Sequence, residues 1–267
     1  MTNKFTLDNT YIGYLNLDHR TDRRELMEAE LKRVGLNAER TRGKMPSEFD
    51  RNNPKYKVQF NRTAGSIGCW HGMEEIAMKA YEQGKHAFIM EDDLIFASDT
   101  LNRLNIISEF TENNDWDIIF AGGTVHINPP FWHTGINPDL PNMPDLGRDC
   151  EYIGHKNIFR TYGSFSTHCW LLNYNSIKKV FSMLDNIEYE AMGIDWALIK
   201  LAPQLKSFCF LPGFAIQRDN QSDIGNGWTY FSGFARLGAH WFADKLNDFD
   251  PLTYNWGEVG FLKENHI

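Results

Sequence analysis

Three consecutive carboxylates are the groups in this sequence best suited to bind a cation. Glu91, Asp92 and Asp93 follow directly after the apolar run 87–90, and such a run is typical of a strand covered on both faces. Adjacent carboxylates repel one another, and a divalent cation with oxygen ligands relieves that repulsion. Magnesium and manganese bind through one or two carboxylates and complete their shells with water and phosphates. The triplet therefore indicates a metal site, the alternative being solvated or helix-capping acids.

The elements around the triplet alternate between strand and helix. Residues 11–17 predict a first strand, and a polar turn leads into a helix that Asp22 is placed to cap and Gly35 to end. A second helix over about 67–80 precedes the strand at 87–90. In open α/β sheets, ligands bind beyond the carboxyl ends of the strands, which is where the triplet stands.

The rest of the chain continues the pattern without a repeat or a linker. The segment 125–160 is a long excursion rich in Pro, Asn, Gly and aromatic residues, and loops of that length are usually functional. We therefore expect one domain over 1–267, in which 228–267 is an aromatic-rich extension. Further strands are predicted at 117–120, 169–174 and 208–211, and a further helix at 176–184.

The composition excludes several classes of protein. A chain of 267 residues that is 42% hydrophobic can bury a large core, so disorder is excluded. The formal charge of −8 disfavours a nucleic-acid partner. Since no apolar stretch is long enough for a signal or a membrane span, we expect a cytoplasmic protein without a transmembrane segment. The four cysteines lack CxxC spacing, which favours buried thiols over disulfides or zinc ligands.

Several segments, in this order along the chain, resemble glycosyltransferase family 25, which includes lipooligosaccharide galactosyltransferases and the collagen hydroxylysine galactosyltransferases. The resemblance runs from about residue 11 to 225. It departs from the family at 70–73, where Trp-His-Gly-Met stands in place of the usual Ser-His pair. The matching segments are 14–24 (YLNLDHRTDRR), 65–69 (GSIGC), 88–93 (FIMEDD), 116–120 (WDIIF), 166–171 (STHCWL), 194–198 (IDWAL), Gln217 and 222–224 (SDI).

The resemblance implies a GT-A-type nucleotide-sugar-binding α/β/α sandwich with a mixed, mostly parallel central sheet. It implies an inverting, metal-dependent transfer of galactose or glucose from a UDP-sugar to a hydroxyl of a glycan or protein acceptor, as in lipopolysaccharide biosynthesis, with Mn²⁺ or Mg²⁺ as the cofactor. The ions would stabilise the charge that develops on the departing diphosphate. Alternative readings are a non-catalytic GT-A-like sugar- or nucleotide-binding module and, ranked last, a metal phosphohydrolase.

The resemblance also implies roles for individual residues. Glu91 and Asp93 would hold the metal, and Asp223 would join them or serve as an ordinary loop aspartate. Arg23 and Arg24 fit the solvated face of the first helix equally well, so neither is assigned to the donor. The residues expected to bind the donor are Asn16, Arg20, Arg40, Gly43, Gly65, Asp92 and Gln217.

A hydroxyl acceptor needs a base to take its proton during a single displacement. Asp195 is the candidate for this role, although its position also suits a helix N-cap. His168 is the rival candidate, and it could equally be a core histidine whose hydrogen bonds are satisfied.

Overall fold

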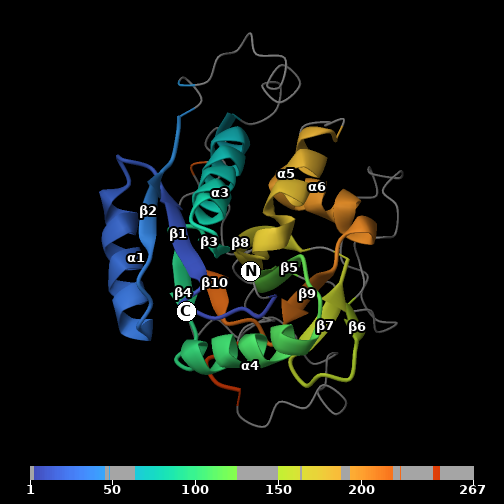
Figure 1. Ribbon diagram of the computed structural model, residues 1–267. Helices are drawn as coiled ribbons and strands as arrows, with labels where there is room; N and C mark the ends of the chain where they lie inside the picture. The colour runs from blue at the N-terminus through green and yellow to red at the C-terminus, as the bar shows by residue number, and fades with distance from the viewer. Residues whose placement is uncertain are drawn as a thin grey trace, which may run out of the picture.

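The computed structural model describes residues 3–45, 48, 64–124, 150–162, 164–187, 193–218, 223 and 243–246, and these build a ten-stranded β-sheet with helices on both faces (Figure 1). The helices are α1 (Thr21–Val34), α3 (Ala64–Glu82), α4 (Thr100–Asn113), α5 (Ile177–Asp185) and α6 (Ile194–Leu201). The strands are β1 (Thr10–Asn16), β2 (Glu39–Arg42), β3 (His86–Met90), β4 (Leu94–Phe96), β5 (Ile118–Thr124), β6 (Cys150–Tyr152), β7 (Ile158–Thr161), β8 (Phe165–Leu172), β9 (Ser207–Phe210) and β10 (Ala215–Gln217).

The sheet is mixed, and most of its strands point the same way, as predicted. The order is β2-β1-β3-β8-β5-β9-β7-β6, and β10 joins β5 to β4. β1 pairs in parallel with β2 and β3, and β5 pairs in parallel with β9 and β10. β8 lies antiparallel between β3 and β5, and β4 and β7 also run against their neighbours.

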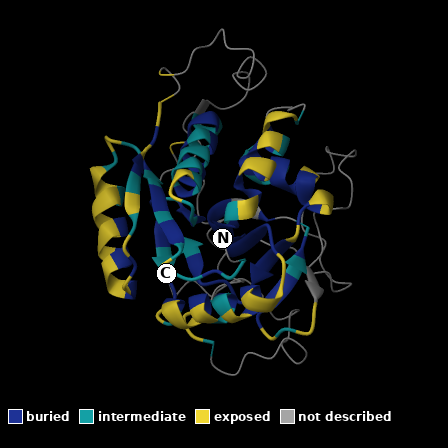
Figure 2. Ribbon diagram, in the orientation of Figure 1, coloured by how far each residue is buried: buried dark blue, intermediate teal, exposed yellow. Residues whose placement is uncertain are grey.

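Alternate residues of the central strands pack under different helices. In β3, Ala87 and Ile89 join a core under α3, α5 and α6, whereas Phe88 and Met90 join a second core under α1 and α4. This alternation is the period-two geometry of a strand covered on both faces. Figure 2 shows the resulting buried sheet between helices whose outer faces are exposed. The predicted α/β/α sandwich is therefore confirmed.

Most of the predicted elements lie within a few residues of the observed ones, and two local predictions were wrong. Asp22 does not cap α1, because its carboxylate accepts hydrogen bonds from the guanidinium of Arg20 at 3.0 and 2.9 Å. Ser176 stands at the start of α5, but its hydroxyl donates to Asp117 rather than capping the helix. In the long excursion, 125–149 lies outside the described residues, while its end carries β6 and β7.

The described part of the predicted C-terminal extension, residues 243–246, packs on α4. The buried Arg103 donates to the carbonyl oxygens of Pro212, Gly213 and Ala243, and Ser98 N donates to Asp244 Oδ1 at 2.8 Å. No helix within the described ranges is long and apolar enough to cross a membrane.

Glu30 ties α1 to the two short strands β4 and β10. Its side chain is 7% exposed and accepts hydrogen bonds from Arg33 Nε at 3.0 Å and Phe96 N at 2.6 Å. The guanidinium of Arg218, directly after β10, lies 3.6 Å from Glu30 Oε2. Burial alone would raise the pKa of Glu30, but the bonds from Arg33 and Phe96 outweigh it and the pKa lies below its ordinary value of 4.5. The buried charge is therefore stabilised in the folded state.

We expect Glu30→Gln to lower the free energy of unfolding by about 1–3 kcal/mol at pH 7, because it weakens hydrogen bonds to a charged, buried group. The loss should shrink as the pH falls below 4.5 through the folded-state pKa, since the carboxylate is then protonated in the parent. Urea unfolding measures both effects. Glu28→Gln is the matched control on the same helix: its pair with Arg24 is 49% exposed, so the cost should stay below about 1 kcal/mol. Equal losses in the two variants would contradict the role of Glu30.

Candidate active site

The acidic triplet lies where the carboxyl ends of β1 and β3 meet. Tyr14 of β1 pairs with Met90, the last residue of β3, and Glu91 N donates to His168 O at 2.9 Å. Asp92 and Asp93 are only 7% and 6% exposed, and Glu91 is half-buried. The strand therefore delivers three adjacent carboxylates to a largely desolvated edge of the sheet.

Asn16, at the end of β1, connects Asp92 to the edge strand β2. Its amide nitrogen donates to Asp92 Oδ2 at 2.6 Å, and its side-chain oxygen accepts from Arg40 Nε at 2.9 Å. Gly43 N, just after β2, donates to Asn16 O at 2.9 Å. A Cβ at Gly43 would lie 2.9 Å from Leu17 Cδ2, so this close approach favours glycine. Four of the expected donor-binding residues thus form one network.

Arg23 belongs to this site, although the sequence did not assign it to the donor. Its Nη1 lies 3.0 Å from Asp92 Oδ1 and 3.4 Å from Asp93 Oδ2, and its side chain is only 11% exposed. The signal was the helical spacing: Arg23 precedes the buried Met27 by four residues and so shares its inward face. Arg24 instead lies half-exposed beside Glu28.

Arg20 and Asp223 form a second ion pair beside the first. The guanidinium of Arg20 donates hydrogen bonds to both carboxylate oxygens of Asp22 and also to Asp223. Asp223 Oδ2 lies 3.9 Å from Arg23 Nη1 as well. Asp223 therefore lies at the edge of the acidic cluster, next to Arg20 and Arg23, and its Oδ1 lies 4.0 Å from His19 Nε2.

The donors that contact Glu91 are weaker than those that contact the two aspartates. Gln217, the last residue of β10, donates from Nε2 to Glu91 Oε2 at 2.9 Å, and the thiol of Cys69 lies 3.7 Å from Oε1. Burial, followed by the charges of Asp93 and Asp92, raises the pKa of Glu91 to about 8. The cluster therefore carries negative charge that the protein compensates only in part.

Asp195 lies in the first turn of α6, after the N-cap Gly193, and is half-buried. Its Oδ1 accepts from Trp196 N at 3.0 Å. Burial raises the pKa of the Cys69 thiol, and the charges of Glu91 and then Asp195 raise it further, so Asp195 lies within electrostatic range of Cys69.

His168 is enclosed more tightly than Asp195. It is 2% exposed, and its Nε2 lies 3.2 Å from the carbonyl oxygen of Ala215. A Cβ at Gly122 would lie 2.5 Å from the same Nε2, so β5 passes directly against the ring. These contacts are those of a core histidine between β8, β5 and β10.

The segment that departs from the family pattern belongs to α3 and serves mainly in packing. Trp70 and Met73 are buried in the core, and His71 Nδ1 lies 3.3 Å from Glu74 Oε2. A Cβ at Gly72 would lie 2.1 Å from Leu15 Cδ1, so glycine lets the helix lie close to β1. Cys69, rather than His71, faces the triplet.

The amino end of α3 also lies at the carboxyl edge of the sheet, because the helix runs into β3 through a short turn. Gly65 stands in its first turn and is half-buried. Within the described ranges no group of three or more His, Cys, Asp or Glu side chains is arranged to hold a metal ion. Any cation at the triplet would therefore draw ligands from fewer protein carboxylates and from bound substrate.

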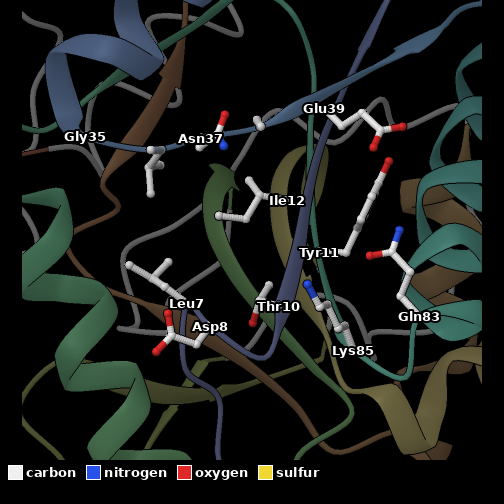
Figure 3. Close-up of a pocket in the computed structure, with 12 residues that line it drawn as sticks. Leu7, Asp8, Thr10, Tyr11, Ile12, Gly35, Asn37, Glu39, Gln83 and Lys85 are labelled. Atoms are coloured by element: carbon white, nitrogen blue, oxygen red, sulfur yellow. The ribbon is translucent and has the colours of Figure 1, made fainter.

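A surface hollow of about 600 Å³ lies away from these residues (Figure 3). Thr10, Glu39 and Lys85 line it, at or just before the amino ends of β1, β2 and β3. The hollow is thus at the opposite edge of the sheet from the triplet and contributes nothing to the chemistry described above.

No known family model matches the chain, and no curated protein does. Among the solved structures that align with the chain are two transferases. A glycosyltransferase involved in the glycosylation of the major capsid of PBCV-1 aligns at 10% identity and a TM-score of 0.40, over 87% of this chain and 98% of the other. The inositol-1-phosphate CTP transferase from T. maritima aligns at 13% identity and a TM-score of 0.37, over 87% and 77%. These scores are too low to carry either activity over.

The raised pKa of Glu91 predicts an unusual dependence of stability on pH. Between pH 4.5 and about 8 the folded chain keeps a proton that the unfolded chain has released, so the stability of the parent should fall as the pH rises. Glu91→Gln removes this extra bound proton. The free energy of unfolding of the variant, relative to that of the parent, should therefore rise as the pH rises across that range. Urea unfolding at pH 5, 6.5 and 8 with a chelator measures the difference. A difference that does not change with pH would contradict the assignment, and the exposed Glu112→Gln serves as the control.

Proposed function

We propose that this protein is a glycosyltransferase that moves a hexose from a UDP-sugar to a hydroxyl of a glycan or protein, with Mn²⁺ or Mg²⁺ bound at the acidic triplet. The observation that carries the proposal is the partly compensated carboxylate cluster at the carboxyl ends of β1 and β3, flanked by Arg20 and Arg23. Such an edge brings a cation and an anionic diphosphate together. The ordered resemblance to glycosyltransferase family 25 supports the same function.

The residues at the triplet fit a magnesium or manganese ion. Both ions prefer carboxylate oxygens, and a cation would offset the burial and the charges of Asp93 and Asp92 that raise the pKa of Glu91. Glu91 and Asp93 would hold the ion, and two carboxylates suffice where substrate phosphates supply further ligands. When bound, the ion supplies Lewis-acid stabilisation of the leaving diphosphate. We propose Asp223 as a supporting ligand that would have to leave Arg20 to serve.

The network around Asn16 supports the donor assignment. Asp92 is fixed by Asn16 and Arg23, which suits it to orient the donor rather than to ligate the cation. Arg40 and Gly43 hold Asn16 from β2, where a nucleoside would lie against the edge of the sheet. Gln217 and Gly65 border the opposite side, next to Glu91 and at the start of α3.

Asp195 is the better candidate for the base. Its carboxylate is half-buried in the first turn of α6, so an acceptor hydroxyl can approach it. His168 is nearly inaccessible and in contact with Ala215 O. One accessible base on one side of the donor is what an inverting single displacement requires.

The first test is calorimetric titration of UDP and of UDP-galactose or UDP-glucose into the chelated protein, with and without Mn²⁺. We expect binding that depends on Mn²⁺ and slow hydrolysis of the cognate UDP-sugar. Asp93→Asn should weaken Mn²⁺-dependent UDP binding at least tenfold, because it removes a charged oxygen ligand.

Asp8→Asn is the matched control, since Asp8 is exposed at the other edge of the sheet. Undiminished binding in Asp93→Asn would remove the metal assignment. Metal-dependent binding in the parent without turnover of any sugar would favour the non-catalytic module.

A second test separates the base from the binding residues. Asp195→Asn should lower kcat about 10²–10⁴-fold while the KM for the donor changes little, because general-base assistance acts in the transition state. The readout is sugar transfer or UDP-sugar hydrolysis. Urea unfolding checks that His168→Gln is folded. If Asp195→Asn turns over normally and the folded His168→Gln variant does not, His168 takes the role of base.

A further inference from the structure

Arg23 places its positive charge among the carboxylates of the acidic cluster. Its Nη1 lies 3.0 Å from Asp92, 3.4 Å from Asp93 and 3.9 Å from Asp223, and the Arg23, Asp92 and Asp93 side chains are about one-tenth exposed. Charged pairs with this little solvent are screened weakly. The guanidinium is therefore a strong local counter-ion of the acidic cluster.

A metal ion bound to Asp93 would compete with this guanidinium. Both carry positive charge, and both would lie within a few ångströms of Asp93 Oδ2. Arg20 does not compete at Asp93, because its guanidinium contacts Asp22 and Asp223 at the rim of the cluster. Loading the metal at Asp93 is thus favoured by any ligand that draws Arg23 away.

A nucleoside diphosphate is a ligand of that kind. Its phosphate oxygens accept paired hydrogen bonds from a guanidinium, which makes arginine a favoured partner of phosphates. Arg23 lies at the amino end of α1, one turn from the end of β1, and its long side chain can turn from Asp92 and Asp93 to a neighbouring anion without moving the helix.

We propose that Arg23 is an exchangeable counter-ion: it neutralises Asp92 and Asp93 in the empty site and transfers to the donor diphosphate when the divalent cation takes its place. The inference rests on the proposed function and names a donor-binding residue that the sequence did not assign. It makes the cation and the nucleotide bind with positive coupling, and the coupling is the same whichever binds first. A purely structural role of Arg23 predicts the opposite, because loss of a support for Asp93 would weaken the metal site.

The experiment measures Mn²⁺ affinity by calorimetry, alone and with saturating UDP, in the parent, Arg23→Gln and Arg24→Gln. In Arg23→Gln the affinity for Mn²⁺ alone should rise about tenfold, and the further gain produced by UDP should fall by a similar factor. Arg24→Gln is the matched control, since its neighbour Glu28 lies outside the cluster and the pair is 49% exposed. It should behave as the parent does.

Each other outcome overturns the inference. Unchanged or weaker Mn²⁺ binding in Arg23→Gln shows that Arg23 only supports the site. Stronger Mn²⁺ binding with unchanged coupling to UDP shows that Arg23 repels the cation but does not transfer to the diphosphate. In both cases the parent still binds Mn²⁺ and UDP, so the proposed function stands. A parent that binds neither overturns both.

A second measurement does not depend on the folding of Arg23→Gln. The Nε–H signal of Arg23 in the NMR spectrum of the parent, assigned by its loss in Arg23→Lys, should shift when Mg²⁺ and UDP are added together. It should shift less with Mg²⁺ alone or UDP alone. No change on adding both ligands would overturn the exchange.

Discussion

The repulsion among Glu91, Asp92 and Asp93 is the constraint on which the rest of this edge depends. Three adjacent carboxylates with little solvent cannot all ionise without partners, because burial and like charges both disfavour the charged form. The partners come from elements far apart in the sequence: Asn16 from β1, Arg23 from α1 and Gln217 from β10. Arg218 N also donates to the main-chain carbonyl oxygen of Asp93 at 2.6 Å, which fixes the backbone of the triplet rather than its charge. The sheet order that brings these strands together thus also supplies the partners that stabilise the three adjacent carboxylates.

The topology of the sheet explains why so many groups converge on one edge. β8 runs antiparallel between β3 and β5, so Cys169 in its middle lies beside Met90 at the end of β3, and its first residue, Phe165, lies beside Thr124 at the end of β5. β10 pairs in parallel with β5 and antiparallel with β4, which brings Gln217 opposite Leu94, directly after the triplet. The cost of holding the charges is spread over contacts with α1 and α3 and across the sheet, so no one contact has to offset it alone.

Local sequence signals predicted the elements well, and long-range contacts explain where they failed. The apolar run before Glu91 and the glycine after α1 are local, and both were read correctly. Asp22 looks like a cap by spacing, but its carboxylate accepts from Arg20, which also donates to Asp223. Asp223 lies about two hundred positions away in the chain, and nothing in the sequence near Asp22 reports it.

The residues of the candidate site also divide into those that local sequence motifs predict and those that only the fold brings to the site. The carboxylates, Asn16 and Gln217 could be assigned because ordered motifs carry them, whereas Arg23 could be placed only by knowing which face of α1 is inward. That face follows from Met27, Leu31 and Val34, which are buried at helical spacing. Cys69 was dismissed as an ordinary buried thiol, and its approach to Glu91 needs α3 to lie close to β1, as Gly72 permits.

The charge balance of the site explains how a buried acidic cluster can be stable and still able to bind. At neutral pH the raised pKa of Glu91 keeps a proton on most of the molecules, and Arg23 offsets the aspartates beside it. A divalent cation with a nucleoside diphosphate is itself a pair of nearly balanced charges. If the pair enters as the proposal requires, it replaces a proton and a guanidinium by one cation, and it gives the released guanidinium an anionic partner. Charge is then exchanged within the site rather than added to it, which keeps the cost of desolvating new charge low.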